Sequence, residues 1–433
     1  MSLSTELRTQ LAGFGVIIPE ICLPGDTIDL ERWSVLACDQ HTSEPDYWEE
    51  VGQYVGDAPS ALHCIIPEAY LDSQDVNDRV ARAQEAMRTY LRDQTIGDPR
   101  EAFMLVRRTL SDGSVRNGLV VALDLEHYDY STGADTLIRA TEKTIVERIP
   151  PRMMIRDGAP LELPHVLVMV DDPDGLLIEP LAAKRTELQK AYSTSLMFGG
   201  GSVEGRLVSA ESEVEGILAA LTTLADPARS LRRYGSENPV LFPVGDGNHS
   251  LAAAKRYWET RKAQGSDEHD PARYAMVELV NLHGPGLPFK PIHRTILGRS
   301  AKETARALER AGFTETDDAG TAEPEANAGA SELKLRSGSD TTRYRHNRTD
   351  TLVVTAVDGM LQELEPSKID YIHGNDAIDS ALRRGETVIE LPPLARDKLI
   401  PTVIEHGALP RKAFSLGRSE DKRYYLEARR LHQ

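Results

Sequence analysis

The chain has 433 residues, of which 40% are hydrophobic and 27% are charged, and its formal net charge is −18. This length predicts two or three folding units with a sizeable core. A net negative surface repels nucleic-acid phosphates and anionic membranes, which disfavours both as partners. Three cysteines without CxxC spacing, a polar start and short apolar runs predict a cytoplasmic protein without a membrane span.

The first region, residues 1–130, is predicted to be α/β. Apolar residues recur at helical spacing over 73–93, which predicts an amphipathic helix. Two β-rich runs, 103–110 and 118–125, are separated by a Ser-Asp-Gly-Ser turn, which predicts a hairpin.

A polar loop follows the apolar run that ends at Cys38. Loops that carry hydrogen-bonding side chains commonly line a cleft. The candidate substrate-binding residues of this loop are Asp39, Gln40, His41, Thr42 and Ser43. Cys38 is better explained as a buried structural thiol than as a nucleophile, because an acidic neighbour does not lower the pKa of a thiol.

The second region, residues 131–300, is predicted to hold the functional core. Its segment 139–156 combines arginines with threonine hydroxyls in a chain that is short of positive charge. Arginine binds phosphate through paired hydrogen bonds, and a desolvated Glu142 could act as a general base. The alternative is a solvated basic edge that pairs with surface acids. The candidate nucleotide-binding residues of this segment are Arg139, Thr141, Lys143, Thr144, Arg148 and Arg152.

The strongest local pattern is the turn between a predicted strand at 240–244 and a predicted helix that begins near His249. Glycines let the backbone approach a ligand, and the first N–H groups of a helix form an anion site. Asp246 and His249 are the catalytic candidates, and Asp246 is also the candidate Mg²⁺ ligand. The candidate nucleotide-binding residues of the turn are Gly245, Gly247, Asn248 and Ser250. The alternative is that Asp246 or Asn248 merely caps the helix.

Beyond the turn, the sequence signals are weaker. A strand is expected at 274–282, and His293 with Arg294 forms a further basic spot that we assign to substrate binding. The third region, residues 301–433, is predicted to be α/β with a flexible insertion near 316–340. Its expected elements are strands at 351–357, 387–391 and 423–426 and a helix from Asn375 to about Gly385. The mixture of hairpins and strand–helix units predicts mixed α/β or α+β architecture.

Several long phrases of the sequence resemble domain-of-unknown-function family 1015. They run in order from about Ile18 to Leu431, and they are WSVLACDQHTSEPDYWEEV, LIRATEKTIVERIPPRMMIR, ELPHVLVMVDDP, VGDGNHSLAAAK, KIDYIHG and LPRKAFSLGRSEDKRYYLEARRL. The common family form of the turn, Asp-Gly-His-His-Arg, is similar to the phosphate loop of ADP-dependent free serine kinases. Those kinases resemble sulfiredoxin and ParB-type domains. The resemblance therefore implies mixed β-sheets with flanking helices, a ParB/sulfiredoxin-like nucleotide-binding core and additional N- and C-terminal elements.

By the same resemblance, Asp246, Gly247 and His249 match the Asp, the Gly and the second His of the loop. An upstream acid acts as the base in such kinases, and Glu142 is the candidate. Asn248 departs from the first His, and Ser250 departs from the phosphate-clamping Arg. Nucleotide binding then requires an arginine or lysine of segment 139–156 to replace the missing guanidinium.

The resemblance implies a Mg²⁺-dependent phosphotransferase that exchanges a phosphoryl group between ADP or ATP and serine or O-phosphoserine. Two alternatives stay open: a phosphoserine phosphatase-like hydrolase that uses water as acceptor, and a nucleotide-binding sensor without turnover. The expected partners are the nucleotide and the small-molecule substrate, with neither nucleic acid nor membrane. A homodimer is left open.

Overall fold

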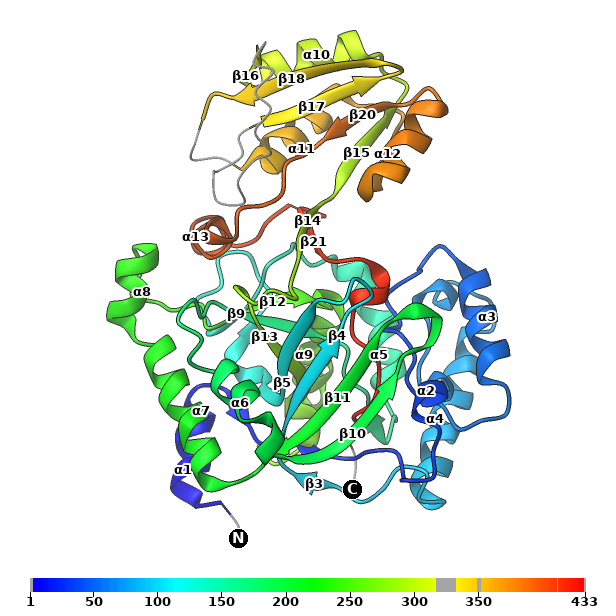
Figure 1. Ribbon diagram of the computed structural model, residues 1–433, viewed down its shortest axis with the longest axis vertical. Helices are drawn as coiled ribbons and strands as arrows, with labels where there is room; N and C mark the ends of the chain where they lie inside the picture. Colours follow the sequence, from blue (N-terminus) through cyan, green and yellow to red (C-terminus); the bar gives the residue numbers. More distant parts are fainter. Residues whose placement is uncertain (1–2, 317–331, 349–351, 411, 432–433) are drawn as a thin grey trace. The chain divides into compact units, whose positions relative to one another are not determined.

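The computed structural model describes residues 3–316, 332–348, 352–410 and 412–431. The chain forms two compact units: unit 1 comprises residues 1–287 and 418–433, and unit 2 comprises residues 288–417 (Figure 1). This division differs from the three regions predicted from the sequence, 1–130, 131–300 and 301–433. The first two regions belong to one unit because their strands pair in a single sheet.

Unit 1 is built on a ten-stranded mixed sheet with the order β10-β11-β4-β5-β13-β9-β12-β7-β6, and β1 pairs with β5. Its strands are β1 (Val16–Ile17), β4 (Phe103–Thr109), β5 (Val115–Asp124), β6 (Tyr128–Asp129), β7 (Ile138–Ala140), β9 (Leu167–Val170), β10 (Gln189–Ser195), β11 (Ser202–Val208), β12 (Phe242–Asp246) and β13 (Tyr274–Asn281). Strands β4 and β5 form the predicted antiparallel hairpin. Strand β12 runs parallel to β7 and antiparallel to β9.

Helices cover both faces of this sheet, so its strands are apolar on both sides. Alternate β5 residues belong to different cores: Leu119 and Val121 pack with α1 and α7, whereas Val120 packs with α2, α3 and α4 (Figure 1). This alternation follows from the two-residue period of a strand. The helices of unit 1 are α1 (Thr5–Gly13), α2 (Leu30–Trp33), α3 (Pro45–Val55), α4 (Val76–Arg92), α5 (Ile149–Arg156), α6 (Glu179–Ala183), α7 (Glu211–Leu224), α8 (Pro227–Tyr234) and α9 (Asn248–Ala263).

The last part of the chain, residues 418–431, returns to unit 1 and is largely buried there. The strand predicted at 423–426 is wrong. Tyr424 makes only an isolated antiparallel bridge to Leu36, and the backbone pairs again at β22 (Arg429–Arg430) with β8 (Leu161–Glu162). Burial holds this segment together with separate backbone hydrogen bonds, such as those from the Tyr425 N–H to the Val35 carbonyl and from the Ala428 N–H to the Cys22 carbonyl. A further short pair joins β2 (Glu20–Ile21) to β3 (Arg100–Glu101).

Unit 2 has a six-stranded sheet with the order β16-β18-β17-β20-β15-β19. Its strands are β14 (Phe289–Pro291), β15 (His293–Leu297), β16 (Phe313–Thr316), β17 (Glu332–Ser337), β18 (Asp340–His346), β19 (Lys368–Ile372), β20 (Thr387–Glu390) and β21 (Phe414–Leu416). Its helices are α10 (Ala301–Arg310), α11 (Val353–Leu364), α12 (Gly374–Arg383) and α13 (Arg396–His406). Strands β14 and β21 form a separate pair.

Two sequence predictions for unit 2 need correction. The segment predicted as a strand at 351–357 enters α11, whose buried residues recur at helical spacing: Val353, Val354, Val357, Met360 and Leu361. The segment predicted as a flexible insertion near 316–340 includes β17 and the start of β18, and residues 317–331 lie outside the described residues. The predicted helix after Asn375 and the strand at 387–391 correspond to α12 and β20.

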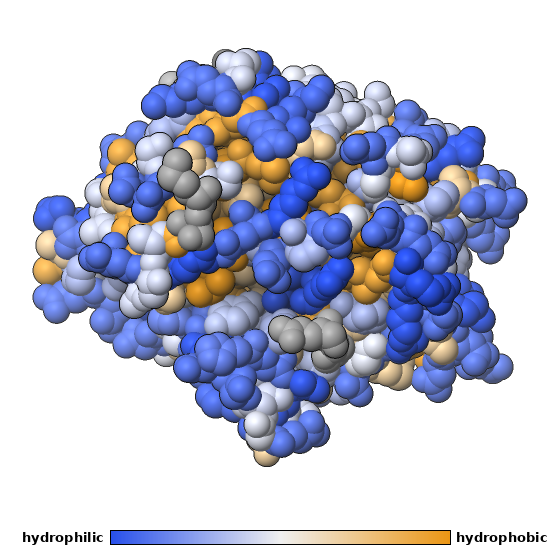
Figure 2. Space-filling view, turned by 90° about the horizontal axis from the view of Figure 1, so that it is seen from below, coloured by the Kyte–Doolittle hydropathy of each residue, from blue (hydrophilic) through white to orange (hydrophobic). Residues whose placement is uncertain are grey.

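The fold class is mixed α/β, as predicted. None of the helices in the described ranges combines the length and the apolar character that a bilayer crossing requires. The face shown in Figure 2 is dominated by hydrophilic residues, with apolar residues showing between them. Such a surface suits the net charge of the chain.

Candidate functional site

The predicted turn lies where β12 ends at Asp246 and α9 begins at Asn248. Gly247 stands between them with φ 80°, a left-handed conformation that glycine adopts without strain. A side chain at Gly247 would also meet Val166, whose Cγ2 lies 3.0 Å and whose Cα lies 3.2 Å from an added Cβ. Both the conformation and the close approach therefore require glycine at this position.

Strand β7 brings segment 139–156, which holds the predicted arginines and Glu142, to the same edge of the sheet. It pairs in parallel with β12, with Ala140 opposite Val244, so Glu142 follows on the edge where Asp246 ends its strand. The Thr141 hydroxyl donates to the Val244 carbonyl at 2.6 Å. Ile145 donates its backbone N–H to His249 Nε2 at 3.2 Å, so this nitrogen is the unprotonated acceptor. The fold thus gathers the two segments that the sequence analysis singled out.

A buried lysine neutralises the carboxylate of the turn. Lys422, from the C-terminal segment of unit 1, places Nζ 3.0 Å from Asp246 Oδ2. Its side chain is only 7% exposed. The pair therefore lies in a partly desolvated setting, and Lys422 attracts an anion there only when the Asp246 carboxylate is shared with another cation or released. Lys422 was absent from the sequence-based candidates.

Asn248, the first residue of α9, carries an unsatisfied polar atom. The residue is 6% exposed, and its side-chain Oδ1 has no hydrogen-bond partner among the described residues. An unpaired buried acceptor costs about 1–3 kcal/mol. The first N–H groups of a helix also lack partners within the helix. The turn therefore presents donors for an anion and an acceptor for a hydroxyl or ammonium group.

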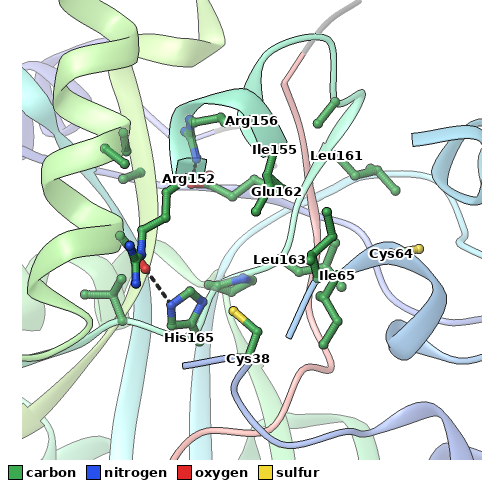
Figure 3. Close-up of a pocket in the computed structure, with 18 of the residues that line it drawn as sticks. Cys38, Cys64, Ile65, Arg152, Ile155, Arg156, Leu161, Glu162, Leu163 and His165 are labelled. Atoms are coloured by element: carbon green, nitrogen blue, oxygen red, sulfur yellow. Dashed lines mark hydrogen bonds and ion pairs between the residues drawn. The ribbon is translucent and has the colours of Figure 1, made fainter. Parts of the chain in front are cut away.

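A pocket of about 140 Å³ adjoins the first turns of α9. Most of its wall is apolar, and its polar lining residues are Cys38, Glu68, Arg152, Arg156, Glu162, His165, Ser250 and Tyr425. In Figure 3 the Arg152 side chain extends from α5 toward His165. Arg152 pairs with Glu68, and Arg156 Nη1 donates to Glu162 Oε1 at 2.7 Å. Burial, together with Asp39, raises the pKa of Glu68, and Arg152 partly opposes the rise.

A chain of hydrogen bonds crosses this pocket wall. Ser250 Oγ lies 2.9 Å from His165 Nε2, and His165 Nδ1 lies 3.1 Å from the Tyr425 hydroxyl. The backbone N–H of Cys38 donates to the same hydroxyl at 3.1 Å. Asp39 Oδ2 lies 4.0 Å from His165 Nε2. The polar loop after Cys38 therefore reaches the first turn of α9 through His165.

Cys38 is expected to stay protonated and is therefore not a nucleophile. Burial raises its pKa far above the ordinary value, and Asp39 and Glu68 raise it further. Because only the thiolate attacks, a thiol with such a pKa is unreactive near neutral pH.

Several predicted residues serve local structure or face solvent. Arg139 is buried and donates to the Thr136 carbonyl and to Asp135, so it does not point at the turn as a free phosphate ligand. Lys143 and Arg148 are exposed, and Thr144 Oγ1 has no hydrogen-bond partner within the described ranges. Of the cationic candidates in segment 139–156, Arg152 lines the pocket that Ser250 also lines.

The residues of the polar loop 39–43 likewise either make local contacts or face solvent. Gln40 donates to Asp39 Oδ1 at 3.0 Å, whereas His41 stacks on Tyr47 with ring centroids 3.9 Å apart. Thr42 and Ser43 are exposed. Asp39 is thus the member of this loop that the structure brings to His165.

His293 and Arg294 belong to unit 2 and are engaged in its interior. His293 Nδ1 accepts from the Leu391 N–H at 3.0 Å. The Arg294 guanidinium pairs with Asp358, with Nε 3.0 Å from Oδ1, and its side chain is 0% exposed. These contacts explain the two residues as structural, and we leave them out of the candidate site.

The residues that sequence reasoning missed, Lys422, His165 and Tyr425, lie far from the turn along the chain. Each falls within a phrase that carries the family resemblance. Membership in such a phrase is the sequence signal that could have identified these three residues. Only the fold shows that they meet at α9.

The residues described here contain no group of three or more His, Cys, Asp or Glu side chains that could hold a metal ion. Magnesium often binds through one carboxylate together with substrate phosphates and water. Asp246 fits only that mode, because Lys422 already pairs with one of its oxygens.

The fold and this turn define a mixed α/β protein with a candidate phosphate site at a helix N-terminus. The chain belongs to the family described as "Protein of unknown function (DUF1015)", whose model matches residues 23–365. No curated protein sequence matches the chain.

Some solved structures are distantly similar. A free serine kinase in complex with AMP is 11% identical with a TM-score of 0.36, over 72% of this chain and 92% of that one. A mutant of that enzyme in complex with ADP is 12% identical with the same TM-score and coverage. SbnI from Staphylococcus aureus, with a C-terminal truncation, is 11% identical with a TM-score of 0.35, over 68% of this chain and 81% of that one. At such TM-scores the likeness carries no argument about activity.

Proposed function

We propose that this protein is a phosphotransferase that exchanges a phosphoryl group between ADP or ATP and serine or O-phosphoserine. The observation that carries the proposal is the turn at 245–250. There the start of α9, the buried cation of Lys422 and the unsatisfied Asn248 Oδ1 lie together. The resemblance of this turn to a nucleotide-phosphate loop supplies the substrate class.

The roles follow from chemistry that needs positioning and charge neutralisation more than covalent work. The phosphate binds at the first turn of α9, where N–H groups and the helix dipole favour an anion. Lys422 adds a positive charge beside it. Asp246 and His249 orient the transferred group, and Glu142 accepts the proton of the serine hydroxyl.

The pocket beside the turn completes the site. Arg152 is our candidate for the guanidinium that the turn itself lacks, because it lines the pocket together with Ser250. Asp39 Oδ2 lies 4.0 Å from Nε2 of His165, which lines the pocket, and Asp39 is the candidate contact for the serine amino group. Three free cysteines suit a cytoplasmic setting for these metabolites.

Mg²⁺ enters this proposal with the nucleotide. Asp246 would hold it as the single protein carboxylate, and the ion would neutralise phosphate charge. Lys422 must then share or release the Asp246 carboxylate on binding.

Two alternatives use the same turn. A phosphoserine phosphatase-like hydrolase would replace the acceptor by water, and the predominantly apolar pocket disfavours it, because little of the wall would order a water molecule. A sensor would bind nucleotide without turnover, and the departure at Ser250 is the feature that favours it.

Isothermal titration with ADP, ATP, serine and O-phosphoserine tests the proposal, with and without MgCl₂. We expect a nucleotide and a serine compound each to bind. Asp246→Asn should lose transfer rate while folding normally, whereas in a sensor it should change affinity alone. Absence of heat with all four compounds contradicts the proposal.

A further inference from the structure

Ser250 and His165 have the arrangement of a nucleophile and its base. Activated serines lie within hydrogen-bond reach of a histidine whose other nitrogen is oriented by a third group. Here Ser250 Oγ lies 2.9 Å from His165 Nε2, and the Tyr425 hydroxyl lies 3.1 Å from Nδ1. Both Ser250 and His165 line the pocket, so a substrate there can reach them.

The partners of Tyr425 allow the tautomer that a base requires. Its hydroxyl oxygen accepts the Cys38 N–H at 3.1 Å and has a second lone pair that faces His165 Nδ1 at 3.1 Å. The oxygen can then accept a second hydrogen, which comes from His165 Nδ1. In that state His165 Nε2 carries no hydrogen and accepts from the Ser250 hydroxyl.

The position of Ser250 in α9 suits a phosphorylated side chain. Ser250 is the third residue of a 16-residue helix, and the Lys422–Asp246 pair lies in the turn before it. Phosphoserine at a helix N-terminus gains hydrogen bonds from N–H groups and a favourable dipole interaction. Asn248 is only 6% exposed, and its Oδ1 has no hydrogen-bond partner among the described residues. This unpaired oxygen is a second sign that the turn binds a ligand.

We propose that Ser250 is a covalent phosphoryl carrier, activated by His165 and positioned through Tyr425. The Ser250 Oγ–P bond forms while the bond from phosphorus to the leaving oxygen of the donor breaks. The Ser250 proton passes to His165 Nε2. In the second half, an acceptor hydroxyl or phosphate oxygen attacks phosphorus, the Ser250 Oγ–P bond breaks, and His165 returns the proton to Ser250 Oγ.

This inference rests on the proposed function and deepens it, since it turns direct transfer into a two-step reaction through the protein. It also gives a role to the residue at which the turn departs from the kinase loop. A hydroxyl in place of an arginine removes a clamp and supplies a nucleophile. In this reaction Glu142 would serve the acceptor hydroxyl, and His165 would serve Ser250.

The experiment incubates the full-length protein with ADP, ATP or O-phosphoserine in turn, quenches it in acid and measures intact mass. We expect an adduct of about 80 Da, one phosphoryl group, that peptide mapping places on Ser250. Labelled AMP should exchange into ADP, or labelled ADP into ATP, without serine. Ser250→Ala should abolish both signals, and His165→Gln should reduce exchange by about a hundredfold or more.

Two further variants separate chemistry from folding. Tyr425→Phe should lower kcat with little change in KM, because it removes only the oxygen that orients His165. His63→Gln is the matched control, since His63 is a half-buried histidine that bonds the Tyr90 hydroxyl at 2.6 Å and does not line the pocket. It should leave the adduct and the exchange unchanged. Circular dichroism checks that each variant folds.

The outcomes distinguish this inference from the proposed function. Transfer between nucleotide and serine without an adduct, at a rate that Ser250→Ala retains, overturns the carrier and leaves the proposed function standing. An adduct from O-phosphoserine that yields only inorganic phosphate supports the carrier and replaces the transferase by a hydrolase. Absence of adduct, exchange and transfer with every compound overturns both.

Discussion

Two polar regions of unit 1 share the C-terminal segment 418–431 yet differ in what offsets the burial of their polar groups. In the buried charge cluster, Arg423 contacts both Glu278 and Glu427, and its Nε donates to the Pro164 carbonyl at 2.9 Å. At the α9 turn, by contrast, Asn248 Oδ1 has no hydrogen-bond partner among the described residues. The first region offsets its buried charges with counter-charges, although Glu278 Oε1 also lacks a hydrogen-bond partner among the described residues. The second region has a buried amide oxygen without a partner at the start of a helix.

This difference separates structure from function in physical terms. Burying a charge is tolerated when counter-charges and hydrogen bonds replace water. A buried group left unpaired beside a pocket lowers stability, and a ligand can restore the missing bond. We therefore expect the charge cluster to govern stability and the turn to govern binding.

The largest effect should come from opening the charge cluster. Arg423→Met leaves Glu427 buried without its counter-charge and leaves Glu278 with only Arg116, 3.9 Å away. We expect a loss of about 3–5 kcal/mol in the free energy of unfolding. Urea denaturation measures it. Arg430→Met is the control on the same segment, because Arg430 is 44% exposed and lies 3.8 Å from an exposed Asp98. It should cost about 0–1 kcal/mol, and equal losses in the two variants would remove the distinction.

A second well-paired cluster, around Asp171, should affect the free energy of unfolding at acidic pH. Burial raises the pKa of Asp171, but hydrogen bonds from His283, Tyr234 and Arg233 outweigh it and hold that pKa at about 2. The folded-state pKa is depressed, so this stability is present above pH 4 and is lost as pH falls toward 2. The contribution is about 2 kcal/mol. Asp171→Asn should flatten this part of the pH–stability profile, and an unchanged profile would contradict the assignment.

Two buried asparagines provide the sharpest test of paired against unpaired groups. Asn248→Ala should leave the free energy of unfolding unchanged or raise it by up to about 1–3 kcal/mol, because it removes a buried acceptor that has no hydrogen-bond partner among the described residues. It should weaken ADP binding about tenfold, or about 1.4 kcal/mol. Calorimetry measures the binding.

Asn281→Ala is the matched control. Asn281 Nδ2 donates to the Asp172 carbonyl and to Glu179 Oε1, both at 2.8 Å. Its removal should cost about 1–3 kcal/mol of stability and leave affinity unchanged. The reverse pattern in the two variants would overturn the comparison.

The smallest effect should come from thiol reagents. Burial raises the pKa of Cys64 to about 12 and that of Cys38 still further. We expect no rapid labelling of the native protein by iodoacetamide at pH 7.5, and labelling of all three cysteines after unfolding in guanidinium. Rapid native labelling of Cys38 would show an accessible thiolate at the pocket.

Local patterns predicted the elements around the site well. The helical spacing over 73–93 gave α4, and the glycines around Asp246 marked the turn that links β12 to α9. Such features depend on neighbours within a few residues. The run at 351–357 is predicted as a strand, but α11 begins at Val353 within it, because a short apolar run does not reveal its period.

The composition of the site depended on distant contacts that local patterns do not encode. Lys422 and His165 reach α9 only because residues 418–431 thread back through unit 1 and because the segment before β9 passes beside α9. The arginines of segment 139–156 look alike in sequence. In the fold Arg139 is buried against Asp135, whereas Arg152 lines the pocket.

The most direct test of the central claim is ³¹P NMR of the full-length protein with serine, MgCl₂ and either ADP or ATP, run also in reverse with O-phosphoserine and AMP or ADP. We expect the O-phosphoserine resonance to grow as the nucleotide loses its terminal phosphate, and Asp246→Asn to slow that growth sharply. Spectra that stay unchanged in both directions at high protein concentration would contradict phosphoryl exchange at the α9 turn.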